Sequence, residues 1–305
     1  MDYSLELTHA LAELSRITGI HMDIQVNSPE EMSVALEQIH RLNTAYKEKY
    51  SKNYFLLNLM NASQPIPDLY DRAKRLHIQP ELSRILVLLE AKSPLDDISV
   101  SILKQLFPYP ENIHFITIDE YHLAILLPVN ADIEEDIDQT VLTIMDTLET
   151  EAQIQIKLAY SDSFDSLNQL SNAYRQTRLA LKVGQLFYSE QTIYPFNRLG
   201  IGRLIYQIPR ELCIDFIKEI FGDVTDSPFD TETLAAADKF FQNNLNISET
   251  SRQLYIHRNT LIYRLDQIQK RTGLDLRNFE DALTFKIAMM LMNCLQSERN
   301  DSHER

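Results

Sequence analysis

The feature that most constrains this chain is a pair of short helical segments joined by a tight turn near its C-terminus, in residues 248–270. Ser248 is a suitable N-cap for a seven-residue helix, and residues 255–258 form a four-residue turn. The second helix ends at Gly273 and has one buried face at helical spacing, made by Leu261, Leu265 and Ile268. A seven-residue helix is not stable alone, so it must pack on the second helix through Leu254 and Leu261. Two helices joined in this way are typical of a helix-turn-helix, in which the second helix enters the major groove of DNA.

The second helix, Asn259 to Thr272, has a polar face that points away from Leu261. Together with the turn before it, this face holds eight candidate DNA-binding residues: His257, Arg258, Asn259, Thr260, Tyr263, Arg264, Gln267 and Lys270. Asparagine and glutamine can hydrogen-bond adenine through two atoms at once, whereas arginine and lysine bind guanine or phosphate. The alternative is a solvated face in an ordinary helical bundle, because many helical hairpins share this spacing.

The charge of the chain is unevenly distributed. Its formal net charge is −15, but residues 230–305 contribute only −1 and residues 1–229 contribute the remaining −14. Residues 252–277 hold six basic and two acidic side chains, a local charge of +4. Because salt screens charges beyond a Debye length of about 10 Å, the local charge decides whether phosphates are contacted. An acidic chain with a basic C-terminal segment is therefore compatible with a double-stranded DNA partner.

Residues 1–61 are predicted to form an N-terminal helical segment, with a short strand at His21 to Val26. Ser28 and Pro29 begin a long helix that runs to about Met60. Its seam, at alternating steps of three and four, comprises Met32, Ala35, Ile39, Leu42, Tyr46, Lys49, Asn53, Leu56 and Met60. Two interpretations fit this seam: a coiled coil that makes the protein a homodimer, and an amphipathic helix packed on its own domain.

The middle of the chain, residues 62–198, alternates between strand and helix patterns. Strands are predicted at Arg84–Glu90, Ile113–Ile118, Leu123–Leu127 and Gln153–Ala159, with helices at Asp96–Leu106, Ile133–Leu148 and Leu167–Phe187. Strand, helix, hairpin, helix, strand, helix is the order of a ferredoxin-like α+β sheet. A helical connector and linker at residues 199–228 then precede an all-α domain at residues 229–305, which contains the helix-turn-helix.

The sequence IHRNTLIYRLDQIQKRTGLDLRNFEDALTFKIAMML, which begins at Ile256, closely resembles the C-terminal helix-turn-helix of PucR/CdaR-type regulators. The matching elements are His-Arg-Asn-Thr-Leu at 257–261, Tyr-Arg-Leu at 263–265 and Thr-Gly-Leu-Asp-Leu at 272–276. The resemblance implies a sequence-specific DNA-binding transcriptional regulator of catabolic genes. Ser251 stands where such motifs usually have alanine, and Tyr255 stands where many have glycine, which bears on the geometry of the turn.

Residues 66–195 resemble, more weakly, the GGDEF-like domain of the same regulators. Cyclases of that fold carry Gly-Gly-Asp-Glu-Phe in the hairpin turn, where the glycines let backbone amides approach a triphosphate. The matching turn here, Ile118 to Ala124, keeps the acidic Asp119 and Glu120 but has no glycine. We therefore expect a degenerate domain with no catalytic residues and no enzymatic activity. The alternative is a nucleotide-binding sensor or nucleotidyl cyclase that uses this domain.

Few signals indicate other classes of function. Cys213 and Cys294 lie beside apolar runs and are expected to be buried, reduced thiols. The chain has no secretory signal and no apolar run near the ~18 residues of a membrane span, so a cytoplasmic location and no membrane partner are expected. His114 and His122 flank the hairpin, and a meeting of the two across it would suggest a metal site, but without a third ligand ordinary strand histidines are favoured. No cofactor is expected, and the class of any small-molecule effector is unknown.

Overall fold

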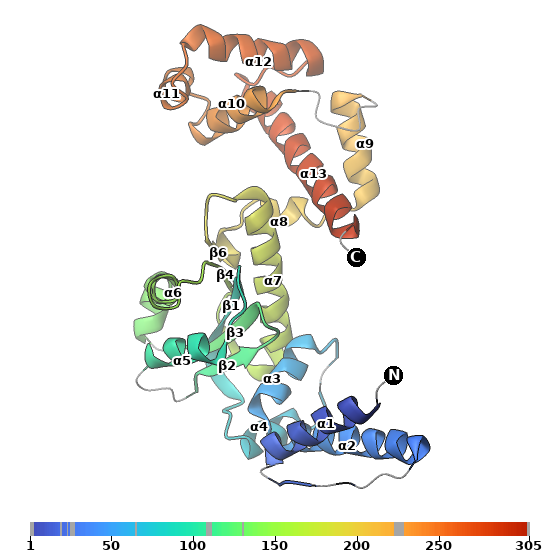
Figure 1. Cartoon of the computed structure of the whole chain (residues 1–305). Helices are drawn as coiled ribbons and strands as arrows, with labels where there is room; N and C mark the ends of the chain where they lie inside the picture. Colours follow the sequence, from blue (N-terminus) through green and yellow to red (C-terminus); the bar gives the residue numbers. More distant parts are fainter. Residues whose placement is uncertain are drawn as a thin grey trace. The chain divides into compact units, whose positions relative to one another are not determined.

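A computed structural model describes residues 3–18, 20–22, 24, 28–64, 66–107, 112–129, 131–222 and 229–303. The chain forms two compact units (Figure 1): one contains Met1–Leu181 and Thr192–Arg198, and the other contains Lys182–Gln191 and Leu199–Arg305. None of the described helices is long and apolar enough to cross a membrane. The strand predicted at residues 21–26 is absent from its described residues 21, 22 and 24, and the others lie outside the described residues.

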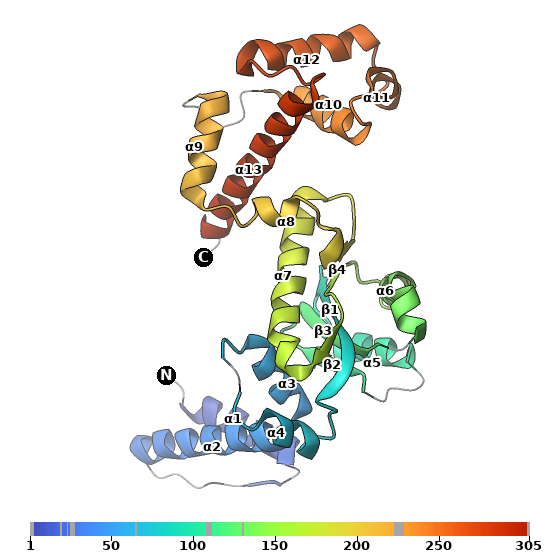
Figure 2. The same cartoon turned by 180° about the vertical axis from the view of Figure 1, so that it is seen from behind.

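The two N-terminal helices pack on each other. α1 (Tyr3–Thr18) and α2 (Pro29–Tyr50) lie side by side in both views (Figures 1 and 2) and bury an apolar cluster of Leu7, Ala10, Leu14, Leu36 and Ile39. The buried Asn43 side-chain amide donates a hydrogen bond to the Ala10 carbonyl oxygen (3.1 Å). The seam of α2 is therefore partly used within one chain, because Ile39 packs on α1 while Leu42 stays 52% exposed.

The prediction of one long helix that runs to Met60 is wrong, because residues 29–61 form two helices that are separated at Ser51. Ser51 caps α3 (Lys52–Asn61), and its hydroxyl accepts a hydrogen bond from the Tyr54 amide (3.2 Å). The Asn53 side chain then exchanges hydrogen bonds with the Thr117 backbone, at 3.4 and 3.0 Å. The seam positions after Ser51 thus pack on the sheet of the same chain, and they do not extend a coiled coil.

The middle of the chain forms a six-stranded sheet with the order β2-β3-β1-β4-β6, in which β5 also pairs with β1. The strands are β1 (Glu81–Ala91), β2 (His114–Thr117), β3 (His122–Pro128), β4 (Ile156–Tyr160), β5 (Phe164–Ser166) and β6 (Ile193–Pro195). β1 is antiparallel to β3, β4 and β5, whereas β6 joins β4 in parallel. The order β2-β3-β1-β4 confirms the predicted ferredoxin-like α+β domain.

Helices cover both faces of this sheet (Figures 1 and 2). On one face, α5 (Asp97–Gln105) and α6 (Ala131–Glu151) close a core with Ile85, Val87 and Leu89 of β1. α7 (Leu170–Phe187) begins along the opposite face, and α4 (Leu69–Arg75) precedes β1. Because helices flank the sheet on both sides, β1 is buried at every position from 84 to 89, which explains its nearly continuous apolar sequence.

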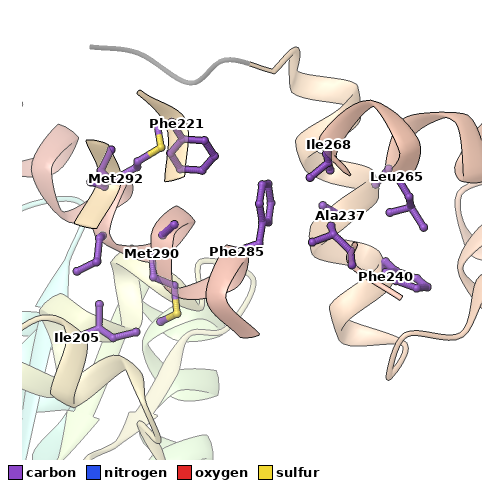
Figure 3. Close-up of a cluster of buried hydrophobic side chains, with 14 of the residues drawn as sticks. Ile205, Phe221, Ala237, Phe240, Leu265, Ile268, Phe285, Met290 and Met292 are labelled. Carbon is purple, nitrogen blue, oxygen red and sulfur yellow. The ribbon is translucent and has the colours of Figure 1, made fainter. Parts of the chain in front are cut away.

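The second unit is all-helical. Its helices after α7 are α8 (Gly202–Ile205), α9 (Arg210–Phe221), α10 (Thr231–Gln242), α11 (Ile247–Gln253), α12 (Arg258–Thr272) and α13 (Phe279–His303). Phe285 of α13 lies in the core between α9 and α10 (Figure 3). Its ring centroid is 5.8 Å from that of Phe221, 6.0 Å from that of Phe229 and 6.4 Å from that of Phe241. Four aromatic rings therefore meet where these helices converge.

The segment expected to connect the domains contributes to this core. Ile205, Cys213, Ile217 and Phe221 are buried in it, and α9 lies beside α13 in both views (Figures 1 and 2). Residues 199–222 thus form part of the C-terminal unit, and residues 223–228 of the predicted linker lie outside the described residues. Cys213 and Cys294 are both buried free thiols, as predicted.

Candidate nucleic-acid interface

The first helix of the pair, α11, begins directly after Asn246. The Asn246 side-chain oxygen accepts a hydrogen bond from the Glu249 amide (3.1 Å), so the cap predicted at Ser248 is wrong by two residues. Asn244 and Leu245, just before the cap, both have positive φ values, 53° and 60°. Asn244 and Leu245 turn the chain sharply after α10. α11 therefore starts at Ile247, two residues before the start that the predicted Ser248 cap implies.

The turn between α11 and α12 is closed by backbone hydrogen bonds. The Tyr255 amide donates to the Arg252 carbonyl (3.2 Å), and the Ile256 amide donates to the Ser251 carbonyl (3.1 Å). Tyr255 takes φ = 55°, the left-handed conformation that glycine usually supplies, and it is 96% exposed. The tyrosine therefore leaves the turn intact, and Ser251, which is 8% exposed, is small enough to fit the helix contact.

α12 begins one residue earlier than predicted and ends where predicted. His257 is its N-cap, with Nδ1 accepting from the Asn259 amide (3.2 Å), and Gly273 ends it at φ = 79°. Its buried face is the predicted one, Leu261, Leu265 and Ile268. In Figure 3, Leu265 and Ile268 lie toward Ala237 and Phe240 of α10. The orientation of α12 is thus set by its apolar face.

The opposite face of α12 is polar and open to solvent. Within the described part of the chain, no hydrogen bond or ion pair engages the side chains of six predicted residues: Arg258, Asn259, Thr260, Tyr263, Gln267 and Lys270. All of them except Gln267 are exposed, and His257 is exposed beside them. Polar side chains on a rigid helix are free to exchange water for another partner.

Arg264, another of the predicted DNA-binding residues, is engaged within the chain. Its side chain is only 18% exposed, and its guanidinium forms an ion pair with the Glu232 carboxylate. It also donates a hydrogen bond to the Glu232 carbonyl oxygen (3.3 Å). Arg264 therefore ties α12 to the first turn of α10.

Other basic residues near this face are paired as well. The pairs are Arg252 with Glu249 (2.5 Å), and Arg277 with Asp266 (3.1 Å) and Asp275 (2.6 Å). The hydrogen bond from Arg277 lowers the pKa of Asp275 below its ordinary value. Glu232 and Glu249 lie outside residues 252–277, and including them reduces the local charge from +4 to +2. Arg258 and Lys270, near the two ends of α12, form no ion pair with any described residue.

The hairpin turn of the middle domain is closed by its own residues. The amides of Tyr121 and His122 both donate to the Asp119 carboxylate at 2.8 Å. His122 Nδ1 lies 2.8 Å from the same carboxylate oxygen, and the Glu120 carbonyl accepts from the Leu95 amide (2.7 Å). These two amides of the turn are therefore occupied within the chain and are not available to a phosphate.

The two histidines of the hairpin do not meet across it. Strand register pairs His114 with Leu126, four residues along β3 from His122. His114 Nε2 is buried without a hydrogen-bond partner in the described chain, and burial lowers the pKa of His114 to about 4. The described residues hold no group of three side chains that could bind a metal.

Two family models match the chain. The PucR C-terminal helix-turn-helix domain matches residues 232–291, and the GGDEF-like domain matches residues 61–183. The chain is a PucR/CdaR-type regulator. The helix-turn-helix match begins at Glu232, the residue that anchors Arg264, so the α10–α12 contact lies within the PucR domain.

Three relatives are similar to parts of this chain. The carbohydrate diacid regulator of Escherichia coli is 25% identical over 269 residues, which cover 84% of this PucR/CdaR-type chain and 69% of the relative. The purine catabolism regulatory protein of Bacillus subtilis is 23% identical over 194 residues, 62% of this chain and 36% of the relative. The proline-responsive transcriptional activator PutR of Bacillus subtilis is 27% identical over 143 residues, 45% of this chain and 34% of the relative. The matched part of this chain therefore spans about a third of the length of each of the two Bacillus subtilis relatives.

Proposed function

We propose that this chain regulates transcription by binding double-stranded DNA and reading its operator with α12. The observation that carries the proposal is the polar face of α12, on which the side chains of Arg258, Asn259, Thr260, Tyr263, Gln267 and Lys270 have no hydrogen-bond or ion-pair partner in the described chain. Arg258 and Lys270 are twelve positions apart, about 18 Å at ~1.5 Å per residue. That separation exceeds the ~12 Å width of the major groove, which suits two cations to phosphates on opposite sides of it.

Asn259 is the residue best placed to read a base. It lies in the first turn of α12, the part of a recognition helix that contacts base edges. Its amide group can donate to and accept from adenine at the same time. Thr260 and Gln267 add hydrogen-bonding groups on the same face, and Tyr263 adds an exposed ring.

Asn259→Ala is expected to relax the preference for one base pair, at a cost of about 1–3 kcal/mol, because the paired hydrogen bonds to adenine are lost. The measurement is operator selection from random duplexes by the full chain, followed by sequencing. Asn61→Ala makes the same change at an exposed asparagine of α3 and is expected to leave the selected sequence unchanged. If wild type and Asn259→Ala select the same sequence equally well, α12 is not the reader.

The proposal includes catabolic genes as targets and a small metabolite as effector. Its support is the names of the relatives, which refer to carbohydrate diacids, purine catabolism and proline. A regulator of this kind acts on the chromosome, so the proposed location is the cytoplasm.

A catalytic role for the GGDEF-like domain is not part of the proposal. The hairpin turn has no glycine, and the amides of Tyr121 and His122 are held by Asp119. The alternative, a nucleotidyl cyclase or nucleotide-binding sensor, requires amides of this turn that are released toward a phosphate. Nothing in the turn favours that release over its own hydrogen bonds.

The proposal also includes a homodimer, because a single helix-turn-helix buries little surface and usually acts on two half-sites one turn of DNA apart. Ile39 is used inside the chain and cannot also form the interface. Val34 and Leu42, eight positions apart on α2, are 55% and 52% exposed. Leu42 belongs to the predicted seam and Val34 does not; these two exposed side chains of α2 are what a second copy can cover.

A further inference from the structure

Tyr255 has a conformation and an exposure that the fold does not explain. Its φ of 55° lies in the left-handed region, which is disfavoured for a residue with a Cβ and is usually left to glycine or asparagine. Its side chain is 96% exposed, so it buries almost no apolar surface. Neither backbone preference nor core packing accounts for a tyrosine at this position, and strained positions of this kind cluster at functional sites.

Tyr255 also lies at the end of α12 that carries the candidate base-reading residue. It precedes the first residue of α12 by three positions, and the neighbouring Ile256 packs on the core, so the chain turns outward at Tyr255. Arg252 and Arg258 flank it at equal distances in the sequence, and both are exposed. Arg252 is paired with Glu249, whereas Arg258, at the N-terminus of α12, forms no ion pair with any described residue, so the surroundings of this end of the helix favour an anion.

We propose that Tyr255 contacts the sugar–phosphate backbone of duplex DNA beside the major groove that α12 enters. The inference rests on the proposed function and extends the interface from the helix into the turn. A phenol hydroxyl donates to a phosphate oxygen, and tyrosine is among the side chains that make such contacts in DNA complexes. Because phosphates carry no sequence information, Tyr255 contributes affinity and orientation, and the choice of base is left to α12.

Two substitutions separate this role from a structural one. Tyr255→Asn supplies a residue that tolerates the left-handed conformation, so the thermal unfolding midpoint is expected to stay the same or rise. Tyr255→Phe keeps the ring and removes only the hydroxyl. Both are expected to raise the dissociation constant for DNA about tenfold, the effect of losing one hydrogen bond to a charged group.

The measurement is fluorescence anisotropy of the full chain with a selected operator duplex and a random-sequence duplex, across a salt series. Both duplexes are expected to lose affinity by the same factor, since the contact is to the backbone. The salt dependence is expected to stay the same, because a neutral phenol displaces no counterion. Tyr121→Phe, in the hairpin turn of the middle domain and 38% exposed, is the matched control and is expected to bind as wild type.

The possible failures are distinguishable. If both Tyr255 variants bind as wild type while Asn259→Ala still changes the selected sequence, the role of Tyr255 is overturned and the proposed function stands. A lower unfolding midpoint for Tyr255→Asn overturns it as well, because the tyrosine would then be structural. If the wild-type chain binds neither duplex at low salt, both the inference and the proposed function are wrong.

Discussion

Phe285→Ala is expected to destabilise the C-terminal unit by about 3–5 kcal/mol, the usual cost of removing a buried aromatic ring from a core. Phe285 is fully buried, and its ring meets those of Phe221 and Phe229 at interplanar angles of 80° and 62°, the edge-to-face arrangement that adds to apolar burial. The ring joins α13 to α9 and α10 (Figure 3). Its removal leaves a cavity between helices that cannot all close on it.

Phe279→Ala is the matched control, because it makes the same change at the start of the same helix. Phe279 is 67% exposed, so the expected loss is below about 0.5 kcal/mol. Denaturant unfolding of the full chain, followed by circular dichroism, measures both variants; the protein has no tryptophan, so tyrosine fluorescence is the second probe. Equal losses for the two variants would contradict the packing of α9 into the C-terminal core.

Arg264→Ala is expected to weaken operator binding about a hundredfold while leaving its salt dependence unchanged. The substitution removes the ion pair and the hydrogen bond to Glu232, so α12 is no longer held to α10. Each lost link costs about 1.5 kcal/mol, and the proposed dimer would lose two of them. The salt slope is expected to be preserved because the Arg264 guanidinium is bound by Glu232, so that its removal releases no counterions. Anisotropy titrations across a salt series measure both quantities.

Glu232→Ala removes the other half of the same pair and is the natural companion. It is expected to act in the same direction, and the double variant is expected to be no weaker than Arg264→Ala alone, because both changes break one link. A salt slope that falls by about 0.9 for each substituted arginine would instead mark Arg264 as a phosphate contact. Additive losses in the double variant would contradict the link to α10.

The helix-turn-helix is predictable from the sequence because the interactions that define α12 are local. Leu261, Leu265 and Ile268 recur at helical spacing, and Gly273 supplies the left-handed residue that ends the helix. The exposed residues follow from the same helical geometry, which places them opposite the buried face. The observed start of α12 differs from the prediction by one residue, since His257 provides the cap.

Contacts between distant residues account for the parts that the sequence did not predict. Glu232 precedes Arg264 by 32 positions, so no helical pattern reveals that the two are paired. The alternating spacing of the seam continues across Ser51, through the polar Lys49 and Asn53, although the Ser51 hydroxyl caps a new helix that packs on the sheet. The separation of His114 from His122 depends on strand register, which is set by the sheet as a whole.

The central claim, that α12 lies in the major groove, is tested most directly by DNA cleavage from an iron chelate attached to Tyr263→Cys. Tyr263 is 61% exposed in the middle of α12, and the native cysteines are buried, so the introduced thiol is the one labelled. On the selected operator, cuts are expected to cluster at two positions about one turn of DNA apart. The same chelate on Leu142→Cys, 38% exposed on α6, is expected to give only background cleavage. A bound Tyr263→Cys chain that cuts no more than Leu142→Cys would contradict the claim.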